Sequence, residues 1–338
     1  MTNETLALYS NYSIYSAIVV LTLAMLAFAV DVAGTTTRRR QAAEPVHEDA
    51  LVGAGAHVRA GVGAGTGPVR EDAPGGEATA TSPARRRQWA GTGMSLTWLA
   101  LLLMLLCVAL RGLSVSRPPL GNMYEFANVG ATFVLLAFCG YSLRRDLRWL
   151  GLFVAGPVLL TLGLSVTVFY TQASQLLPSL QSFWLVIHVT VATLSVALFT
   201  IAFSVTILYL VQQWLEKLSA SELSGPRANV HELLPSSRQL DRTAYGLHIV
   251  AFPLWTFTLI AGAIWAEQAW GTYWGWDPKE VWTFVIWVVY AAYLHARATS
   301  GWNERKAAYL ALAGYGCILV NYMVVNVYFV GMHSYSGM

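Results

Sequence analysis

A short stretch of the sequence, WGTYWGWDPKEVW at residues 270–282, gathers large flat rings around three charged side chains. Glycines at positions 271 and 275 divide the stretch and permit tight turns that lay rings side by side. A platform of this kind suits a flat, hydrophobic, polarisable ligand. A porphyrin meets that description best, and a quinone or a peptide in an aromatic-lined groove is the alternative. The rings belong to Trp270, Tyr273, Trp274, Trp276 and Trp282.

Part of the same stretch has a simpler explanation. Asp277, Pro278 and Glu280 form a helix-start signature, with an acceptor at the N-cap, proline at the first helical position and a glutamate that reaches back. Tryptophan and tyrosine also gather where a membrane meets water. Such a belt accounts for one or two rings, but not for six between Trp265 and Trp282. Asp277 is therefore first a cap, and its place in the loop makes it a candidate binding residue as well.

Histidines distinguish among the possible ligands because haem iron is held by axial side chains, most often imidazoles, from two sides. A lone histidine inside a membrane also serves packing or hydrogen bonding, although ionisable groups at that depth are functional candidates. Their depths decide which of them can act together. Four of the seven histidines lie in or next to long apolar runs: His188, His248, His295 and His333.

Composition indicates the solvent that these residues meet. With 56% hydrophobic and 12% charged residues, a chain of 338 residues is too apolar for a soluble domain. Crossing a hydrocarbon core takes about 20 helical residues. The sequence therefore predicts an all-α, polytopic membrane helix bundle of about eight transmembrane helices, near residues 13–33, 94–113, 122–142, 150–170, 183–214, 243–266, 280–297 and 307–330.

The distribution of lysine and arginine predicts the orientation, because these residues accumulate in cytoplasmic loops. Four loops hold 18 of the 21 cationic residues: 34–93, 142–149, 215–242 and 296–306. The other three are Arg111, Arg117 and Lys279. Both termini and the tryptophan-rich loop are therefore predicted to be external, on a multi-pass protein of the plasma membrane.

The histidines fall at two depths in this arrangement. His188 lies about one turn into the fifth span from its external end, and His333 follows the last span. Two imidazoles from separate helices thus share a face with the tryptophans, as an axial clamp requires. His295 follows Asp277 by 18 residues on one helix, which places it roughly 27 Å lower. His248 lies at a similar inner depth, and two levels of sites predict that a ligand moves between them.

The chain divides into three predicted regions. Residues 1–33 form an uncleaved N-terminal transmembrane anchor, and 34–93 form a cytoplasmic disordered linker that is rich in alanine, glycine and proline. Residues 94–338 carry the candidate site. No CxxC or CxxCH motif occurs, which excludes a dithiol oxidoreductase and a c-type cytochrome. The cysteines are instead predicted to be buried packing residues: Cys107, Cys139 and Cys317.

Several motifs in order point to one family. WGTYWGWDPKE resembles the tryptophan-rich WWD signature of membrane haem-handling proteins. Its continuation DPKEVWTFVIWVVYAAYLHAR, with GNMYEF, SFWLVIHV and GMHSYSG, resembles the system II cytochrome c biogenesis family of the CcsA or ResC type. The similarity covers roughly 94–338, a cytochrome c assembly domain. System I haem delivery proteins share the loop but usually continue differently after WD, and the linker is not part of the family pattern.

This resemblance implies that haem b, as substrate, crosses the membrane and is presented externally for thioether attachment to the CxxCH of apocytochrome c. Haem would enter at an inner site with His295, and His188 and His333 would be the outer axial ligands. A ResB-type membrane partner would complete a cytochrome c synthase, or haem lyase, and supply the other inner histidine. Whether the chain alone is an enzyme stays open. His248 departs from the pattern and is either a packing residue or an inner ligand.

Further expectations concern partners and charge. A thioredoxin-like thiol reductant is an expected partner, and nucleic acid is not. Haem propionates need cationic or hydrogen-bonding groups, so Lys279, Arg111 and Arg117 are candidates, with solvated interface residues as the alternative. Glu125, three residues after Asn122, is expected in a capping arrangement. One outer imidazole must leave when the CxxCH histidine binds the iron.

Two other classes of function remain open. One is a non-haem membrane transporter or quinone-binding subunit, for which eight spans and an aromatic platform are the only support. The other is an assembly scaffold whose tryptophans grip a partner or the apocytochrome peptide.

Overall fold

The computed structural model describes residues 3–43, 88–176, 181–219, 221–299 and 301–333. Every regular element within these ranges is helical, which confirms the predicted all-α class. Eight helices are long and apolar enough to cross a membrane, as the sequence predicts. Their elements are α1 (Glu4–Ala43), α2 (Gln88–Val115), α3 (Met123–Ser142), η3 (Arg148–Leu150) with α4 (Gly151–Thr167), α5 (Phe183–Leu215), α7 (Ser237–Trp270), α8 (Pro278–Ala298), and α9 (Glu304–Leu319) with η5 (Val320–Val325) and α10 (Asn326–Tyr328); α6 (Pro226–Leu233) is short.

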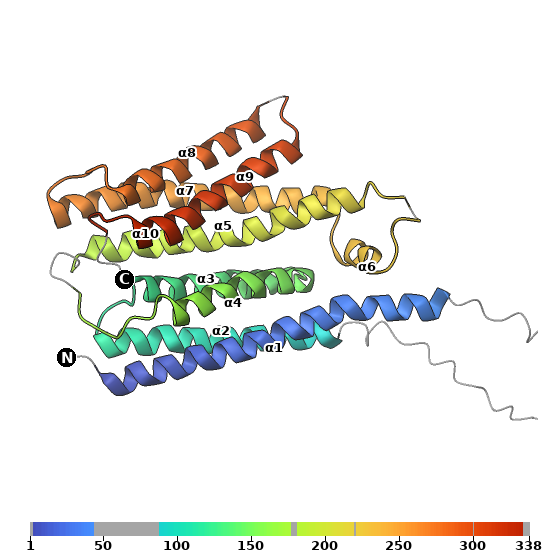
Figure 1. Ribbon diagram of the computed structural model, residues 1–338, viewed down its shortest axis with the longest axis horizontal. Helices are drawn as coiled ribbons and strands as arrows, with labels where there is room; N and C mark the ends of the chain where they lie inside the picture. Colours follow the sequence, from blue (N-terminus) through green and yellow to red (C-terminus); the bar gives the residue numbers. More distant parts are fainter. Residues whose placement is uncertain (1–2, 44–87, 177–180, 220, 300, 334–338) are drawn as a thin grey trace, which may run out of the picture.

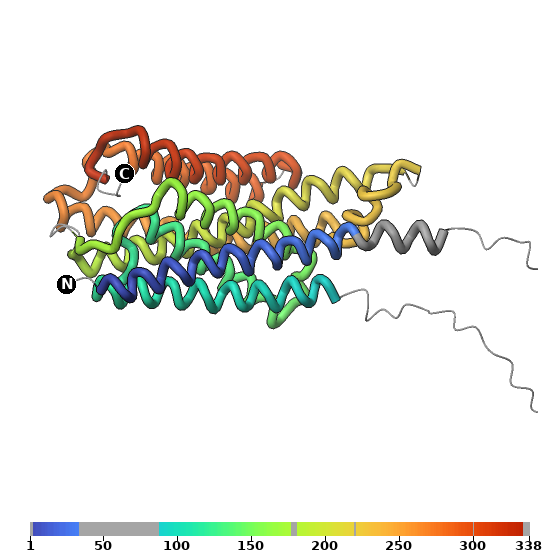
Figure 2. The backbone as a smooth tube through the Cα atoms, turned by 60° about the horizontal axis from the view of Figure 1, so that its bottom comes forward, coloured from blue at the N-terminus to red at the C-terminus, as the bar shows by residue number. Residues whose placement is uncertain are grey.

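The long helices run nearly antiparallel in two groups (Figure 1). In the first group α1 packs along α2 and against α4, and in the second α5 packs along α7 while α8 packs along α9. Helix α3 joins the groups because it packs against both α4 and α5. Figure 2 shows α1 and α2 side by side along the bundle. A large apolar core extends from α1–α4 into α5 and α7, and a second one lies among α5, α7, α8 and α9. A cavity forms where α3 and α4 face α5, α7 and α8.

Local sequence explains where the helices near the tryptophan-rich loop start and stop. Asp277 caps α8 with the predicted capping box, accepting from the backbone of Lys279 while Glu280 accepts from the backbone of Asp277. Gly271 ends α7 in a left-handed conformation with φ of 76°, which glycine adopts without strain. The loop 271–277 between α7 and α8 is therefore held at both ends.

The start of α1 and the last helix, α10, lie at the same end of the bundle as loop 271–277 (Figure 1). This agrees with an even number of spans, and the external side of that end stays a prediction. Helix α1 continues to Ala43 and α2 begins at Gln88, so both reach into the predicted linker 34–93. The remainder of that linker, 44–87, lies outside the described residues. All three cysteines are free, and Cys107 and Cys139 are buried as expected while Cys317 is half-buried.

Candidate functional site

A cavity of about 260 Å³ lies between the two helix groups and reaches the end of the bundle that carries loop 271–277. Its walls come from α3, α4, α5, α7, α8 and the segment from α9 through η5. The deeper wall is apolar, with Val134, Val158 and Ile286 among its residues. Polar groups gather toward the end near the loop, where both predicted outer histidines line the cavity. That end therefore has the groups that would bind a ligand specifically.

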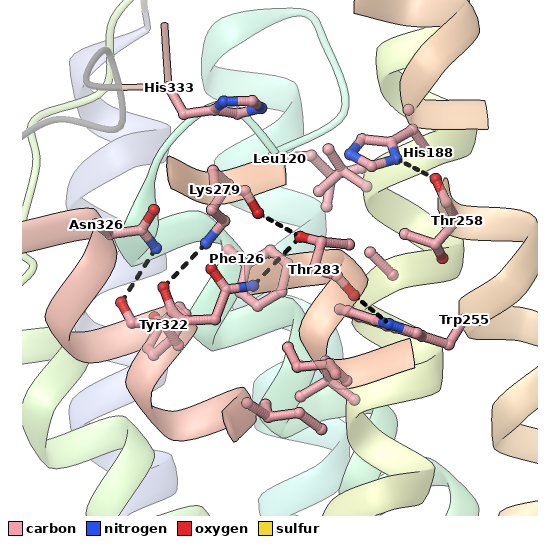
Figure 3. A pocket seen from close by; sticks show the side chains of 18 of the residues that line it. Leu120, Phe126, His188, Trp255, Thr258, Lys279, Thr283, Tyr322, Asn326 and His333 are labelled. Carbon is pink, nitrogen blue, oxygen red and sulfur yellow. Dashed lines mark hydrogen bonds between the residues drawn. The ribbon is translucent and has the colours of Figure 1, made fainter. Parts of the chain in front are cut away.

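His188 enters the cavity from α5 with a fixed orientation (Figure 3). Its Nδ1 lies 3.0 Å from the backbone carbonyl oxygen of Thr258 on α7. Because a carbonyl only accepts, Nδ1 carries the proton and Nε2 keeps its lone pair. The ring also lies close to the backbone of Gly262, where a Cβ would come within 2.7 Å of the imidazole Cε1. This arrangement is the one that metal-binding histidines use.

His333 reaches the same cavity from the segment after α10. Its Nδ1 lies 2.8 Å from Oδ2 of Asp277, a carboxylate that also accepts from the backbone N–H of Met332 and Lys279. A Cβ at position 331 would overlap this carboxylate, so Gly331 permits the close approach. A carboxylate that fixes Nδ1 directs Nε2 to the opposite side, as in carboxylate–histidine–metal arrangements.

The Asp277 carboxyl group is ionised at neutral pH, because its pKa lies below the usual value. Burial by itself would raise the pKa of this carboxyl group, because it disfavours the charged form. The hydrogen bond and charge of His333 and the two backbone N–H donors outweigh burial, and they hold the pKa below its usual value. Asp277 does not line the cavity. It acts on the cavity through His333, while also capping α8.

The indole ring of Trp265 contacts the imidazole rings of both His188 and His333. The ring of Trp265 is stacked on His188 with centroids 6.0 Å apart, and it meets the ring of His333 edge-on at 5.9 Å. The two imidazole centroids are therefore at most 11.9 Å from each other. Trp270 packs edge-on against His333 at 4.9 Å. The imidazoles and these indoles form one continuous aromatic wall at the end of the cavity near loop 271–277.

Loop 271–277 has a defined conformation. Glu280 accepts hydrogen bonds from the N–H of both Gly275 and Asp277, which closes the turn around Trp276. Trp276 has a left-handed φ of 58°, which costs a non-glycine residue about 1 kcal/mol or more. Its side chain is 76% exposed. The turn therefore holds one indole outward at a conformational cost.

The tryptophan-rich stretch divides into two sets. Trp270, Tyr273 and Trp274 line the cavity, as the platform interpretation requires. Trp276 and Trp282 are not among its lining residues. Trp274 meets Trp276 edge-on at 5.8 Å, so the exposed indole extends the aromatic surface outside the cavity. The stretch thus offers both a wall for a ligand and a surface beside it.

The inner histidines lie apart from this cavity. His295 is exposed near the end of α8 that is far from Asp277, as its spacing predicts. His248 is buried on α7 among Phe199, Tyr290 and Tyr293, and its Nδ1 lies 2.7 Å from the carbonyl oxygen of Ala244. Neither histidine lines the cavity. These contacts agree with a packing role for His248 and leave His295 open to a neighbour.

The three cations have different surroundings. Arg111 and Arg117 both pair with the buried Glu125, at 3.1 Å and 2.9 Å, and neither lines the cavity. Asn122 caps the backbone of Glu125, as expected, and the Glu125 carboxylate accepts from Gly121. These groups fix the loop before α3. The third cation, Lys279, does line the cavity.

Sequence reasoning misses several parts of the site. The Asp277 to His333 hydrogen bond joins residues 56 positions apart, and no local pattern reveals it. The π-helical turn η5 interrupts the last span and places Asn321 on the cavity wall. Hydrophobic periodicity does not report such a turn, although π turns are frequent at functional sites. Gly331 in GMHSYSG was the available signal, because a glycine beside a candidate ligand indicates close backbone approach.

The fold and the cavity define a polytopic helical membrane protein with a histidine- and tryptophan-lined site, and comparison with known proteins places it in a family. The family model described as Cytochrome C assembly protein matches residues 96–333. A cytochrome c biogenesis protein CcsA from Guillardia theta is 34% identical over 261 residues, covering 72% of this chain and 85% of that protein. The chain belongs to the cytochrome c assembly protein family, in agreement with the resemblance in its motifs.

Other relatives carry the same name. CcsA from Synechococcus sp. (strain JA-2-3B'a(2-13)) is 34% identical over 299 residues, which covers 72% of this chain and 83% of that protein. CcsA from Chlamydomonas reinhardtii is 35% identical over 241 residues, covering 70% and 65%. The matched range contains both outer histidines and the whole of loop 271–277.

Proposed function

We propose that this protein acts in cytochrome c biogenesis by carrying haem b, its substrate, across the plasma membrane and presenting it on the external face. One observation carries the proposal: His188 and His333 each tie Nδ1 to an oxygen acceptor and flank the same indole at one end of one cavity. The names of the CcsA relatives support the pathway. The two Nε2 atoms are the proposed axial ligands of the haem iron.

The chemistry to be served is thioether formation. The S–H of each CxxCH cysteine adds across a haem vinyl group, so that a C–S bond forms and the proton goes to the neighbouring carbon. This addition consumes no oxidant or reductant, although the thiols must be reduced beforehand. Orientation of the vinyl group against the thiol supplies most of the help that such a reaction needs from a protein. The aromatic wall of Trp265 and Trp270 would hold the macrocycle for that purpose.

Partners follow from the same proposal. Apocytochrome c would approach at loop 271–277, where Trp274 and Trp276 extend the aromatic surface. A ResB-type membrane protein would complete a haem lyase complex, and a thioredoxin-like protein would keep the thiols reduced. His295 is exposed on α8, so a histidine from the membrane partner can share an inner haem with it. Both chain termini and loop 271–277 would be external.

One experiment distinguishes the proposed function from the two alternative classes of function. Expression of the chain with a ResB-type partner and a CxxCH reporter, in cells that lack their own system, should yield covalent haem on the reporter. The His188→Ala, His333→Ala double variant should yield none, and His57→Ala, a linker histidine, should match the wild type. A transporter or quinone-binding subunit predicts no covalent haem at all. A scaffold predicts full haem content in tryptophan-loop variants together with lost co-purification of the apocytochrome.

A further inference from the structure

A single cation lies in the wall of the cavity without an ion-pair partner among the described residues. Lys279, in the first turn of α8, donates from Nζ to the backbone carbonyl oxygen of Asn321 at 3.3 Å. The two nearby acids have other partners, because Asp277 binds His333, and Glu280, which also lines the cavity, accepts from the N–H groups of loop 271–277. A cation inside a membrane protein is costly without an anion, so this ammonium group has capacity for an anionic ligand.

Asn321 adds a second unused group beside Lys279. Its side chain is only 4% exposed, lines the cavity and donates from Nδ2 to the hydroxyl oxygen of Thr283 at 3.3 Å. Its Oδ1 has no hydrogen-bond partner among the described residues. Buried side-chain oxygens almost always have a donor, so this one is available to an O–H or N–H group of a ligand.

The π-helical turn η5 explains why these groups meet. In a π-helix the N–H of each residue donates to the carbonyl oxygen five residues earlier, so residues five apart come closer to one face than they do in a regular α-helix. Asn321 and Asn326 both line the cavity from this segment. Thr283, one turn after Lys279 on α8, donates its hydroxyl to the Lys279 carbonyl and so is oriented to accept from Asn321. The polar corner is therefore built by two helices in fixed register.

The position of this corner within the cavity is informative. Figure 3 shows Lys279 next to the His333 ring, with its Nζ directed away from that ring toward Tyr322. Tyr273 and Trp274 also line the cavity, and they are 61% and 37% exposed, so they form its more exposed side. The cavity thus has a polar corner at Lys279 and Asn321 and an aromatic mouth at Tyr273 and Trp274. A porphyrin has a matching polarity, since haem b carries its two carboxylates and its two vinyl groups on different edges.

We propose that Lys279 and Asn321 bind the propionate edge of haem, so that the vinyl edge faces the mouth beside Tyr273 and Trp274. This inference rests on the proposed function and specifies how the substrate is oriented. One ionised propionate opposite the Lys279 ammonium leaves no net charge, and a protonated second one donates its O–H to Asn321 Oδ1. The vinyl carbons then lie where the CxxCH thiols of an incoming apocytochrome arrive.

The test compares three porphyrins on the complete detergent-purified complex after removal of bound haem. Mesohaem has ethyl groups in place of vinyl groups, and haem dimethyl ester has both propionates masked. Binding is followed by the Soret band of each titration. Mesohaem should bind within about threefold of haem, whereas the ester should bind at least about tenfold more weakly, the loss expected for a hydrogen bond to a charged group.

Variants assign that discrimination to the polar corner. Lys279→Gln should weaken haem about tenfold and leave the ester unchanged, so that haem and ester bind alike. Lys279→Arg keeps the charge and should keep the preference for haem, and Arg305→Gln, at the far end of the bundle, is the matched control. Asn321→Leu should reduce the preference by several fold, the effect of losing a neutral hydrogen bond.

Each outcome decides the matter. If wild-type complex binds the ester as tightly as haem, the proposed orientation is wrong while the haem-binding function stands. The same conclusion follows if Lys279→Gln weakens haem and ester equally. If the wild-type complex binds none of the three porphyrins, the proposed function itself fails and this inference fails with it. The comparison of haem with its ester needs no variant, so it remains decisive if a substitution prevents folding.

Discussion

The two outer imidazoles face one cavity but are held by different means. His188 lies on the continuous helix α5, with its ring against the backbone of α7 at Gly262 and its Nδ1 on a backbone carbonyl. His333 lies on the segment that follows α10 and is held through one carboxylate, that of Asp277. Packing of two long helices fixes the first, and hydrogen bonds to a single side chain fix the second. Under the proposed function, this difference predicts that His333, and not His188, exchanges for the histidine of CxxCH.

The largest expected effect separates these two ligands directly. His188→Ala should lower the haem occupancy of the purified complex at least about a hundredfold. Removing a ligand should cost more than removing a group that only orients a ligand, which typically costs about 10- to 100-fold. His333→Ala should retain haem as a five-coordinate, high-spin species, because the fixed ligand is still present. Absorption spectra with a haem assay measure both. Equal losses in the two variants, or the reverse order, would remove the distinction between a fixed and an exchangeable ligand.

A second prediction sharpens the comparison at Asp277. Asp277→Asn keeps a good N-cap for α8 but removes the charge that orients His333. The loss of a carboxylate behind a histidine ligand typically costs about 10- to 100-fold in affinity or activity. The variant should therefore resemble His333→Ala in its spectrum while melting close to the wild type. A wild-type spectrum, or unfolding of α8, would contradict the assignment of Asp277 to His333.

The third prediction concerns pH. The pKa of Asp277 is lower in the folded protein than in the unfolded chain, despite burial, because of His333 and the backbone donors. Its stabilising contribution is therefore complete above the unfolded pKa of about 3.9 and is lost as pH falls through the lower, folded value. Acid titration should thus leave the Asp277 link intact until below about pH 3.9. Loss of the low-spin haem band of the wild-type complex at a pH well above about 3.9 would contradict this.

The smallest expected effect tests which indoles belong to the site. Trp270 contacts His333, whereas Trp276 is exposed and does not line the cavity. Trp270→Ala should weaken haem binding, since aromatic contacts contribute about 0.5–1.5 kcal/mol beyond their buried area. Trp276→Ala should change haem affinity less than about twofold, within the range of surface substitutions. Haem titrations of both variants measure these affinities. Equal losses of affinity would show that Trp276 contributes to haem binding as much as Trp270 does.

Much of the fold is predictable from the sequence because hydropathy measures the requirement of a membrane directly. The eight spans, and the distance along α8 that separates His295 from Asp277, follow from composition and helical rise. The cap at Asp277 and the turn at Gly271 follow from residue chemistry. All these features depend on local sequence, which is why one chain suffices to predict them.

The rest of the site depends on contacts between distant segments. Arg111 and Arg117, two of the three cations that were candidates for binding propionates, form ion pairs with Glu125. The spacing of these residues in the sequence does not reveal the ion pairs. The direction of Trp276 depends on a left-handed backbone conformation that its own residue type disfavours. The link from Asp277 to His333 and the π turn at Asn321 require packing of the last span against α8. Tertiary packing therefore decides which of the expected residues share the cavity.

The central claim is that His188 and His333 bind one haem iron from its two sides. Electron paramagnetic resonance of the ferric complex tests it most directly, in a His295→Ala background so that an inner haem does not contribute. The account predicts a bis-imidazole low-spin signal that each single outer variant abolishes and that added imidazole restores in His333→Ala. A full low-spin signal in the variant that lacks both outer histidines would contradict it.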